Sequence, residues 1–271
     1  MIRRSDKGRK GAELQLLLAI ALVLLGSVGW LSIGREATAA DGGPGIELGF
    51  VPVDTLHFAA EGRITGLTFM GPDTLAILTD LADSLSESGD REVRLTFQDS
   101  VGAVIRIEDF TGVLDRGLAY DGEFLWSCGD ADDGSSIIYK IEADTLKLEE
   151  AYNAPGHRPC GMCWDGTYVW IGDRDAGRVD RFDPEAGEIT RSVVTPGFSP
   201  FGLAWDGAFM WVTDSGTGRL YRLSGSRRRW SATIDTDSFI FRGLDVLLLH
   251  DGESFWYVPP GENLAIRVLF I

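Results

Sequence analysis

The stretch Gly202-Leu-Ala-Trp-Asp-Gly-Ala-Phe-Met-Trp-Val-Thr-Asp214 decides the fold, because nearly the same phrase recurs along the chain. Close copies begin at Gly117 and Gly161, and weaker copies begin at Gly66 and Gly243. The repeat starts at 66, 117, 161, 202 and 243 are 51, 44, 41 and 41 residues apart. This is the period of a four-stranded propeller blade. The sequence therefore predicts five blades.

Each repeat contains the pattern of four short strands. In the repeat at Gly202, the apolar Gly-Leu-Ala-Trp is expected to form the first strand, and Asp-Gly a tight hairpin turn. Residues 209–213 and 219–223 are predicted as the second and third strands, and residues 189–194 as the fourth strand of the preceding repeat. Residues 81–90, rich in Ser, Asp and Glu, are predicted to form a solvated loop in the first blade.

The two ends of the chain complete the count of blades. The last repeat stops at Ile271 without a fourth strand, and an orphan strand at residues 53–59 precedes the first repeat. Pairing the two would close the ring and remove two exposed sheet edges. The predicted fold is an all-β, five-bladed β-propeller over residues 51–271, closed by an N-terminal strand.

An apolar run precedes this domain. Residues 14–33 are broken only by Gln15, Ser27 and Ser32, and at about 1.5 Å per residue they are long enough to cross a bilayer core of ~30 Å. Five basic residues before the run indicate a cytoplasmic N-terminus. We expect a cytoplasmic segment (1–13), one transmembrane helix (14–33), a linker (34–50) and a periplasmic propeller on a bacterial inner membrane. A signal-peptidase-like Ala37-Thr-Ala39 leaves cleavage as the alternative.

The charge of the chain narrows the class of partner. The net charge of the chain is -16. The N-terminal 40 residues are basic, so the rest of the chain carries a larger negative charge than the whole. Such a surface repels phosphate backbones and anionic headgroups, so nucleic acid is not expected as a partner. A cation or a basic protein surface is the natural counterpart.

The three cysteines are expected in an oxidising compartment. Cys160 and Cys163 have the spacing of a redox or zinc motif, but in a strand residues i and i+3 point to opposite faces. Cys128 and Cys160 are predicted at the same end of neighbouring blades, so we expect a Cys128–Cys160 disulfide and a buried, free Cys163.

Recurrent polar and aromatic residues are assigned to the blades themselves. A residue present in each clear repeat is better explained by blade structure than by metal binding, and aspartate is a common turn acceptor. The tryptophans are expected to pack between blades. The residues concerned are Asp121, Asp165, Asp206, Asp130, Asp173, Asp214, Trp126, Trp170, Trp211 and Trp256.

Candidate ligand contacts are sought where the repeats differ, in the residue before each opening glycine and its neighbours. Such positions should line the mouth of the central channel and could form a basic collar for a small anion or an acidic side chain. The alternative hypothesis is that these arginines form ion pairs with acidic residues of nearby loops: Asp80, Asp83, Asp132, Asp133 and Asp175. The predicted mouth residues are Arg63, Arg116, His157, Arg158, Phe201 and Arg242, with Thr65 and Cys160 at equivalent positions. No catalytic or metal-ligating residue is assigned.

The Gly-Leu-Ala-Trp-Asp-Gly-x-x-x-Trp-Val-x-Asp phrase resembles the blades of bacterial extracytoplasmic propellers of the streptogramin-lyase, gluconolactonase and NHL-repeat groups. The blade count is also similar to that of plant-type glutaminyl cyclotransferases. Their Thr-Gln-Gly-Leu and Glu-Ser-Thr-Gly motifs are replaced by Ile64-Thr-Gly-Leu67 and Ile77-Leu-Thr-Asp80, and the metal-binding Glu, Asn and Asp of gluconolactonases are not recognisable. The resemblance thus implies a fold rather than an activity.

Three functions are compatible with this pattern. The first is a non-catalytic interaction or stabilising subunit of a larger inner-membrane complex, for example an electron-transport assembly, with other membrane proteins as partners and no cofactor. The second is a hydrolase or lyase that uses His157 with Asp115 or Asp245 as acid and base, with Ca²⁺ as an option. The third is a binding protein for a small ligand at the channel mouth.

Overall fold

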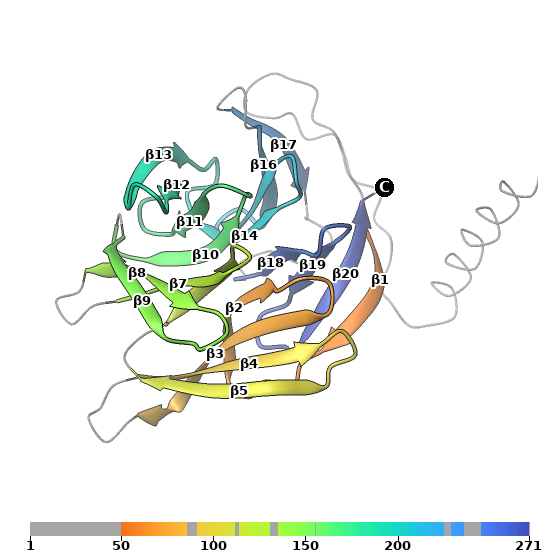
Figure 1. Cartoon of the computed structure of the whole chain (residues 1–271). Coiled ribbons are helices and arrows are strands. Elements are labelled where there is room, and N and C mark those ends of the chain that lie inside the picture. The colour runs from red at the N-terminus through yellow and green to blue at the C-terminus, as the bar shows by residue number, and fades with distance from the viewer. Residues whose placement is uncertain are drawn as a thin grey trace, which may run out of the picture. The chain divides into compact units, whose positions relative to one another are not determined.

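The computed structural model describes residues 50–85, 91–111, 114–130, 135–154, 156–224, 229–235 and 245–270. Within these ranges the chain forms 20 strands in five separate four-stranded antiparallel sheets (Figure 1). The prediction of an all-β, five-bladed propeller is therefore confirmed. In blades 1 to 4 the strands follow one another from the inside outward.

Blade 1 contains β2 (Arg63–Phe69), β3 (Thr74–Leu85), β4 (Arg91–Asp99) and β5 (Val104–Thr111). Blade 2 contains β6 (Arg116–Tyr120), β7 (Phe124–Asp130), β8 (Ser136–Glu142) and β9 (Leu148–Asn153). Blade 3 contains β10 (Pro159–Trp164), β11 (Val169–Asp173), β12 (Arg178–Asp183) and β13 (Glu188–Val194). Blade 4 contains β14 (Pro200–Trp205), β15 (Met210–Asp214), β16 (Arg219–Ser224) and β17 (Arg229–Asp235). Blade 5 contains β18 (Leu247–His250), β19 (Phe255–Val258), β20 (Leu264–Phe270) and, outermost, β1 (Phe50–His57).

The inner strands lie so close together that only glycine fits at their crossing points. A Cβ atom on Gly202 would lie 2.5 Å from the carbonyl oxygen of Val246 and 2.6 Å from the amide nitrogen of Leu248. A Cβ on Gly66 would likewise lie 2.7 Å from the backbone of Gly117 in the next blade. Side-chain atoms essentially never approach backbone this closely, so the opening glycine of the repeat is required by contact between blades.

The last blade departs from this rule and from the sequence prediction. Leu248 pairs with Tyr257 as Leu203 pairs with Val212. The position equivalent to Gly202 is therefore occupied by Leu247. The predicted start at Gly243 was wrong by four residues, and Gly243 lies outside the described residues. In blade 1, residues 81–85 of the predicted loop at 81–90 belong to β3 instead, and residues 86–90 lie outside the described residues.

The hairpin between the first and second strands is organised by one aspartate. The Oδ1 atom of Asp206 accepts hydrogen bonds from the N–H groups of Ala208 (2.8 Å) and Phe209 (2.6 Å), and its Oδ2 atom accepts one from the Trp211 indole (2.6 Å). Gly207 takes a positive φ of 91°, which the first position of this two-residue turn requires. The same set of bonds recurs at Asp121, Asp165 and Asp251. The turn-forming role predicted for the recurrent aspartates is confirmed for these hairpins.

These bonds make the stability of the hairpins depend on pH. Burial raises the pKa of Asp251, but hydrogen bonds from Trp256 and from the N–H groups of Glu253 and Ser254 outweigh it and lower the pKa below its ordinary value. The charge on Asp251 therefore stabilises the folded state above the unfolded-state pKa of about 3.9, and this contribution is lost as the pH falls through the lowered folded-state pKa.

We expect Asp251→Asn to lower the free energy of unfolding by about 1–2 kcal/mol at pH 7 and by less at pH 3, below the unfolded-state pKa. Urea unfolding of the wild type and the variant at the two pH values measures the difference. The exposed Glu262→Gln is the control and should be close to neutral at both. An equal loss for Asp251→Asn at pH 7 and pH 3 would contradict this account.

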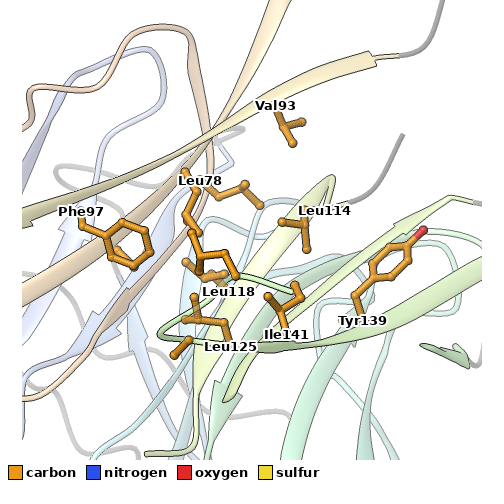
Figure 2. Close-up of a cluster of buried hydrophobic side chains, with 12 residues drawn as sticks. Leu78, Val93, Phe97, Leu114, Leu118, Leu125, Tyr139 and Ile141 are labelled. Atoms are coloured by element: carbon orange, nitrogen blue, oxygen red, sulfur yellow. The ribbon is translucent and has the colours of Figure 1, made fainter. Parts of the chain in front are cut away.

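The described residues form five buried hydrophobic clusters, one at each interface between blades. Figure 2 shows the cluster between blades 1 and 2, where Leu78 and Phe97 face Leu118 and Leu125. The other four clusters join blades 2 and 3, 3 and 4, 4 and 5, and 5 and 1. The tryptophans of the repeat belong to these interfaces, as predicted: Trp126, Trp170, Trp211 and Trp256.

Each of these tryptophans also has a basic partner on the third strand. Trp126 pairs across the strands with Lys140, and Trp211 with Arg222, whose guanidinium carbon lies 4.5 Å from the Phe209 ring centre and 5.5 Å from that of Trp211. The corresponding pairs in blades 3 and 5 are Trp170 with Arg181 and Trp256 with Arg267. Lys140, Arg222 and Arg267 make cation–π contacts with the tryptophans that they pair with. In blade 3 Arg181 lies over Tyr168 instead, and Trp170 has its cation–π contact with Arg191.

Candidate functional site

The inner strands begin at one end of the channel, called here the mouth, and five of the six predicted mouth residues lie in the described part of the chain. Arg116 is held between two carboxylates: its Nη2 atom lies 2.7 Å from Asp115 and also contacts Asp130. Burial lowers the pKa of Arg116, but the charges of Asp115 and Asp130 outweigh it and raise the pKa. Its Nη1 atom donates to the carbonyl of Pro159, at 3.5 Å. Arg116 therefore links blades 2 and 3.

The other described arginines at the mouth are also paired with acids. Arg63 lies 3.1 Å from Asp80, and Arg158 lies 3.9 Å from Asp175. The structure thus favours the alternative interpretation, in which acidic side chains of the loops pair with these arginines. Arg242, Asp132 and Asp133 lie outside the described residues, as do the side-chain surroundings of Asp83.

A further arginine at the mouth was not predicted. Arg174 donates to Asp245 across the channel end (2.7 Å), and its guanidinium carbon lies 5.7 Å from the ring centre of Phe201. Its amide donates to the carbonyl of Arg158 (3.1 Å). Arg174 thereby connects blades 3, 4 and 5. The sequence could have indicated Arg174, because the equivalent position in the repeat at Gly202 is Ser215, so the arginine is not a residue of the repeat.

The remaining candidate residues do not converge on one point. His157 is exposed, and within the described residues it forms no ion pair with Asp115 or Asp245, which are engaged by arginines. Thr65 is buried, and its hydroxyl donates to the carbonyl of Leu78 (3.4 Å). The acid–base pairing considered for His157 is therefore not assembled in this structure.

All three cysteines are free and buried in the structure. The predicted Cys128–Cys160 disulfide is therefore absent from it. The Cys128 thiol donates to the carbonyl of Arg116 (3.0 Å), and the Cys160 thiol donates to the carbonyl of Pro200 (3.2 Å). Burial raises the pKa of Cys160 to about 12 and raises that of Cys128 well above its ordinary value. Both thiols are thus protonated near neutral pH and are poor nucleophiles in the folded state.

Neither a metal-ion cluster nor a membrane-spanning helix is found among the described residues. No group of three or more His, Cys, Asp or Glu side chains in those ranges is placed to hold a metal ion. No helix among them is long and apolar enough to cross a membrane, and residues 14–33 lie outside the described part of the chain.

Below the mouth the channel narrows to a throat. Its walls are Gly66, Gly117, Gly161, Gly202 and Leu247, with the apolar residue that follows each of them. The free volume there is about 10 Å³, close to what a single water molecule needs. The throat therefore separates the mouth from the opposite end of the channel.

The outer strand of blade 1 carries an exposed aliphatic patch that was not predicted from the sequence. Ile105 and Ile107 of β5 are 59% and 46% exposed, and Val104 and Val101 beside them are 45% and 84% exposed. Outer strands β9 and β13 each expose one large aliphatic side chain, Leu148 and Val194. This patch of Val101, Val104, Ile105 and Ile107 is called the β5 patch below.

Comparisons with known proteins identify the fold only. No protein-family model matches the sequence, and no curated protein matches it. Among solved structures, 1045 chains match, so the architecture by itself does not discriminate between functions. One of them, glutaminyl cyclase from Myxococcus xanthus, is 12% identical with a TM-score of 0.62, and the alignment covers 83% of this chain and 98% of that chain.

Proposed function

We propose that this chain is a non-catalytic interaction subunit of an inner-membrane complex. In this proposal residues 14–33 anchor it, the N-terminal strand closes the ring, and the periplasmic propeller binds other membrane proteins. The likeness to Myxococcus xanthus glutaminyl cyclase concerns the fold and adds no activity to the proposal. An electron-transport assembly is one such complex.

The observation that carries the proposal is the β5 patch. Three exposed aliphatic residues of the edge strand β5, together with Val101 in the turn before it, present apolar surface to water, and exposed apolar surface of this kind marks protein contacts. The strand is outermost in its sheet, so its outer edge has no partner strand within the blade. Because the patch occurs in one blade only among the outer strands whose exposure is described, the repeat itself does not explain it.

The charges at the mouth support an interaction role rather than catalysis. Arg116 and Arg174 tie neighbouring inner strands together through Asp115 and Asp245, as expected of groups that hold the blades in place. The strongly acidic remainder of the chain fits a partner surface that is apolar at its centre and basic at its rim.

Replacing Ile105 and Ile107 together by serine tests the proposal. The full-length protein is expressed with an affinity tag in its own membranes, extracted in mild detergent and recovered with its companions. The double variant should recover at least about ten-fold less of any defined companion, because central apolar contacts dominate interface energies. Val194→Ser, which replaces an aliphatic residue of similar exposure (57%) on β13, should recover as much as the wild type. Equal recovery by the double variant would overturn the assignment of the β5 patch.

A further inference from the structure

The outer strand of blade 1 differs from the other outer strands at two positions. Each outer strand has one bulged residue, which the register with the third strand skips, and a paired residue two positions later. In β5 these residues are Ile105 and Ile107, and both are exposed. Among the described outer strands only β5 has large aliphatic residues at both positions, so the repeat does not require them. The other blades have Glu149 and Ala151, Thr190 and Ser192, Ser231 and Thr233, and Val53 and Thr55 there.

Two of the other outer strands carry features that hinder pairing with a further strand. Charged residues and proline commonly protect a sheet edge. β9 has Glu149 and Glu150 exposed, and β1 has Pro52, which has no N–H to donate. In the first half of β5 the only charged residue is Arg106, which is turned toward blade 2 and donates to the carbonyl of Asp144 (2.7 Å). Within the described residues no strand pairs with the outer edge of β5 (Figure 1), so this edge is open to an added strand.

The second half of β5 has an acidic surrounding. Glu108 and Asp109 directly follow the aliphatic residues of the strand. Arg106 lies 3.0 Å from Glu108, and Arg94 lies 2.7 Å from Asp109. Arg94 also lies 3.1 Å from Glu61, whose carboxylate is exposed. Three carboxylates thus share two guanidinium groups, so the group keeps a negative charge. A segment laid along β5 would meet apolar side chains over the first half of the strand and negative charge over the second.

We infer that a companion protein adds an extended segment to the outer edge of β5, as a fifth strand of blade 1. Backbone hydrogen bonds to the open edge supply affinity in such strand addition, and side chains at alternate positions supply specificity. The segment has β-branched aliphatic residues beside Ile105 and Ile107, and Lys or Arg beside Glu108 and Asp109. The inference rests on the proposed interaction role, because it specifies how the β5 patch holds its partner.

Amide hydrogen exchange tests this mode of binding. One sample is the full-length protein recovered with its companions from its own membranes in mild detergent, and the reference is the same protein produced in a host that lacks the companions. With single-amide resolution, alternate amides of β5 should exchange at least about ten-fold more slowly in the complex. They alternate because the amides between them already pair with β4. The amides of β9, the control edge, should exchange equally in both samples.

The outcomes separate this inference from the interaction role on which it rests. Unchanged exchange along β5 in a sample that contains companions would overturn strand addition and leave the interaction role in place. A sample without any companion would overturn both. In the companion we expect one newly protected segment of about five to six residues, the usual length of a strand. A protected segment with net negative charge, or without aliphatic residues, would contradict the chemistry inferred for it.

A matched pair of variants tests the edge itself. Ile105→Glu gives β5 the residue that β9 has at the equivalent position, and it should lower the recovery of companions at least about ten-fold, because a charge on an edge strand opposes pairing. Thr190→Glu places the same charge at the equivalent position of β13 and should recover as much as the wild type. Equal recovery by the two variants would overturn the inference. The exchange measurement uses the wild-type protein, so it decides the question even if Ile105→Glu does not fold.

Discussion

Replacement of Trp126 by alanine is expected to lower the free energy of unfolding by about 4 kcal/mol. The side chain is fully buried, and its ring lies 5.7 Å from that of Phe182 in the next blade and 6.3 Å from that of Tyr152. Truncation of such a residue removes its packing and leaves a cavity, a loss of about 3–5 kcal/mol. It also removes the donor to Asp121 Oδ2 (2.7 Å), so a hairpin carboxylate loses a partner.

Urea unfolding followed by circular dichroism measures this change. Phe198→Ala is the matched control, because it also removes a phenyl-sized group, but one that is 66% exposed. The control should stay within about 0.5 kcal/mol of the wild type. A loss of less than about 1 kcal/mol for Trp126→Ala would show that the tryptophans of the repeat do not hold the blades together.

Replacement of Gly202 by alanine is the second change with a large expected effect. The added Cβ would lie 2.5 Å from the carbonyl oxygen of Val246, and both strands belong to the crowded wall of the channel. Since backbone cannot move away without separating blades 4 and 5, we expect a loss of about 3 kcal/mol or more. The change tests why each of the first four repeats opens with glycine.

Gly216→Ala is the control for this substitution. Its Cβ would come no closer than 3.3 Å to Ser199 Cβ, on a loop at the mouth, and its φ is not in the left-handed region. We expect a change of less than about 1 kcal/mol, of either sign. Equal thermal midpoints for Gly202→Ala and the wild type would rule out the close approach as the reason for the glycine.

The fold could be predicted because the same physical constraints recur in every blade. The repeat requires an opening glycine, an aspartate that organises the turn and a buried tryptophan, so these residue types recur at the same spacing. The prediction failed where one of these residues was replaced. In blade 5, Leu247 takes the place of the glycine, so the glycine pattern placed the start of this repeat at Gly243. The positions of Asp251 and Trp256 indicate the correct register.

The candidate site was less predictable because pairing depends on side-chain geometry. The spacing of Arg116 placed it at the mouth but did not show that Asp115 and Asp130 flank it. Arg174 breaks the repeat, but it follows the second strand instead of preceding an opening glycine, so the pattern at the starts of the inner strands did not indicate it.

The central claim is that this propeller works as a subunit of a membrane complex, and its native mass tests that claim most directly. The full-length protein would be extracted from its own membranes in mild detergent, separated on a native gel and analysed by mass spectrometry with whatever co-migrates. The account predicts a band far above the 29.6 kDa chain, with defined membrane-protein companions. A band near the mass of the chain plus detergent, without companions, would contradict it.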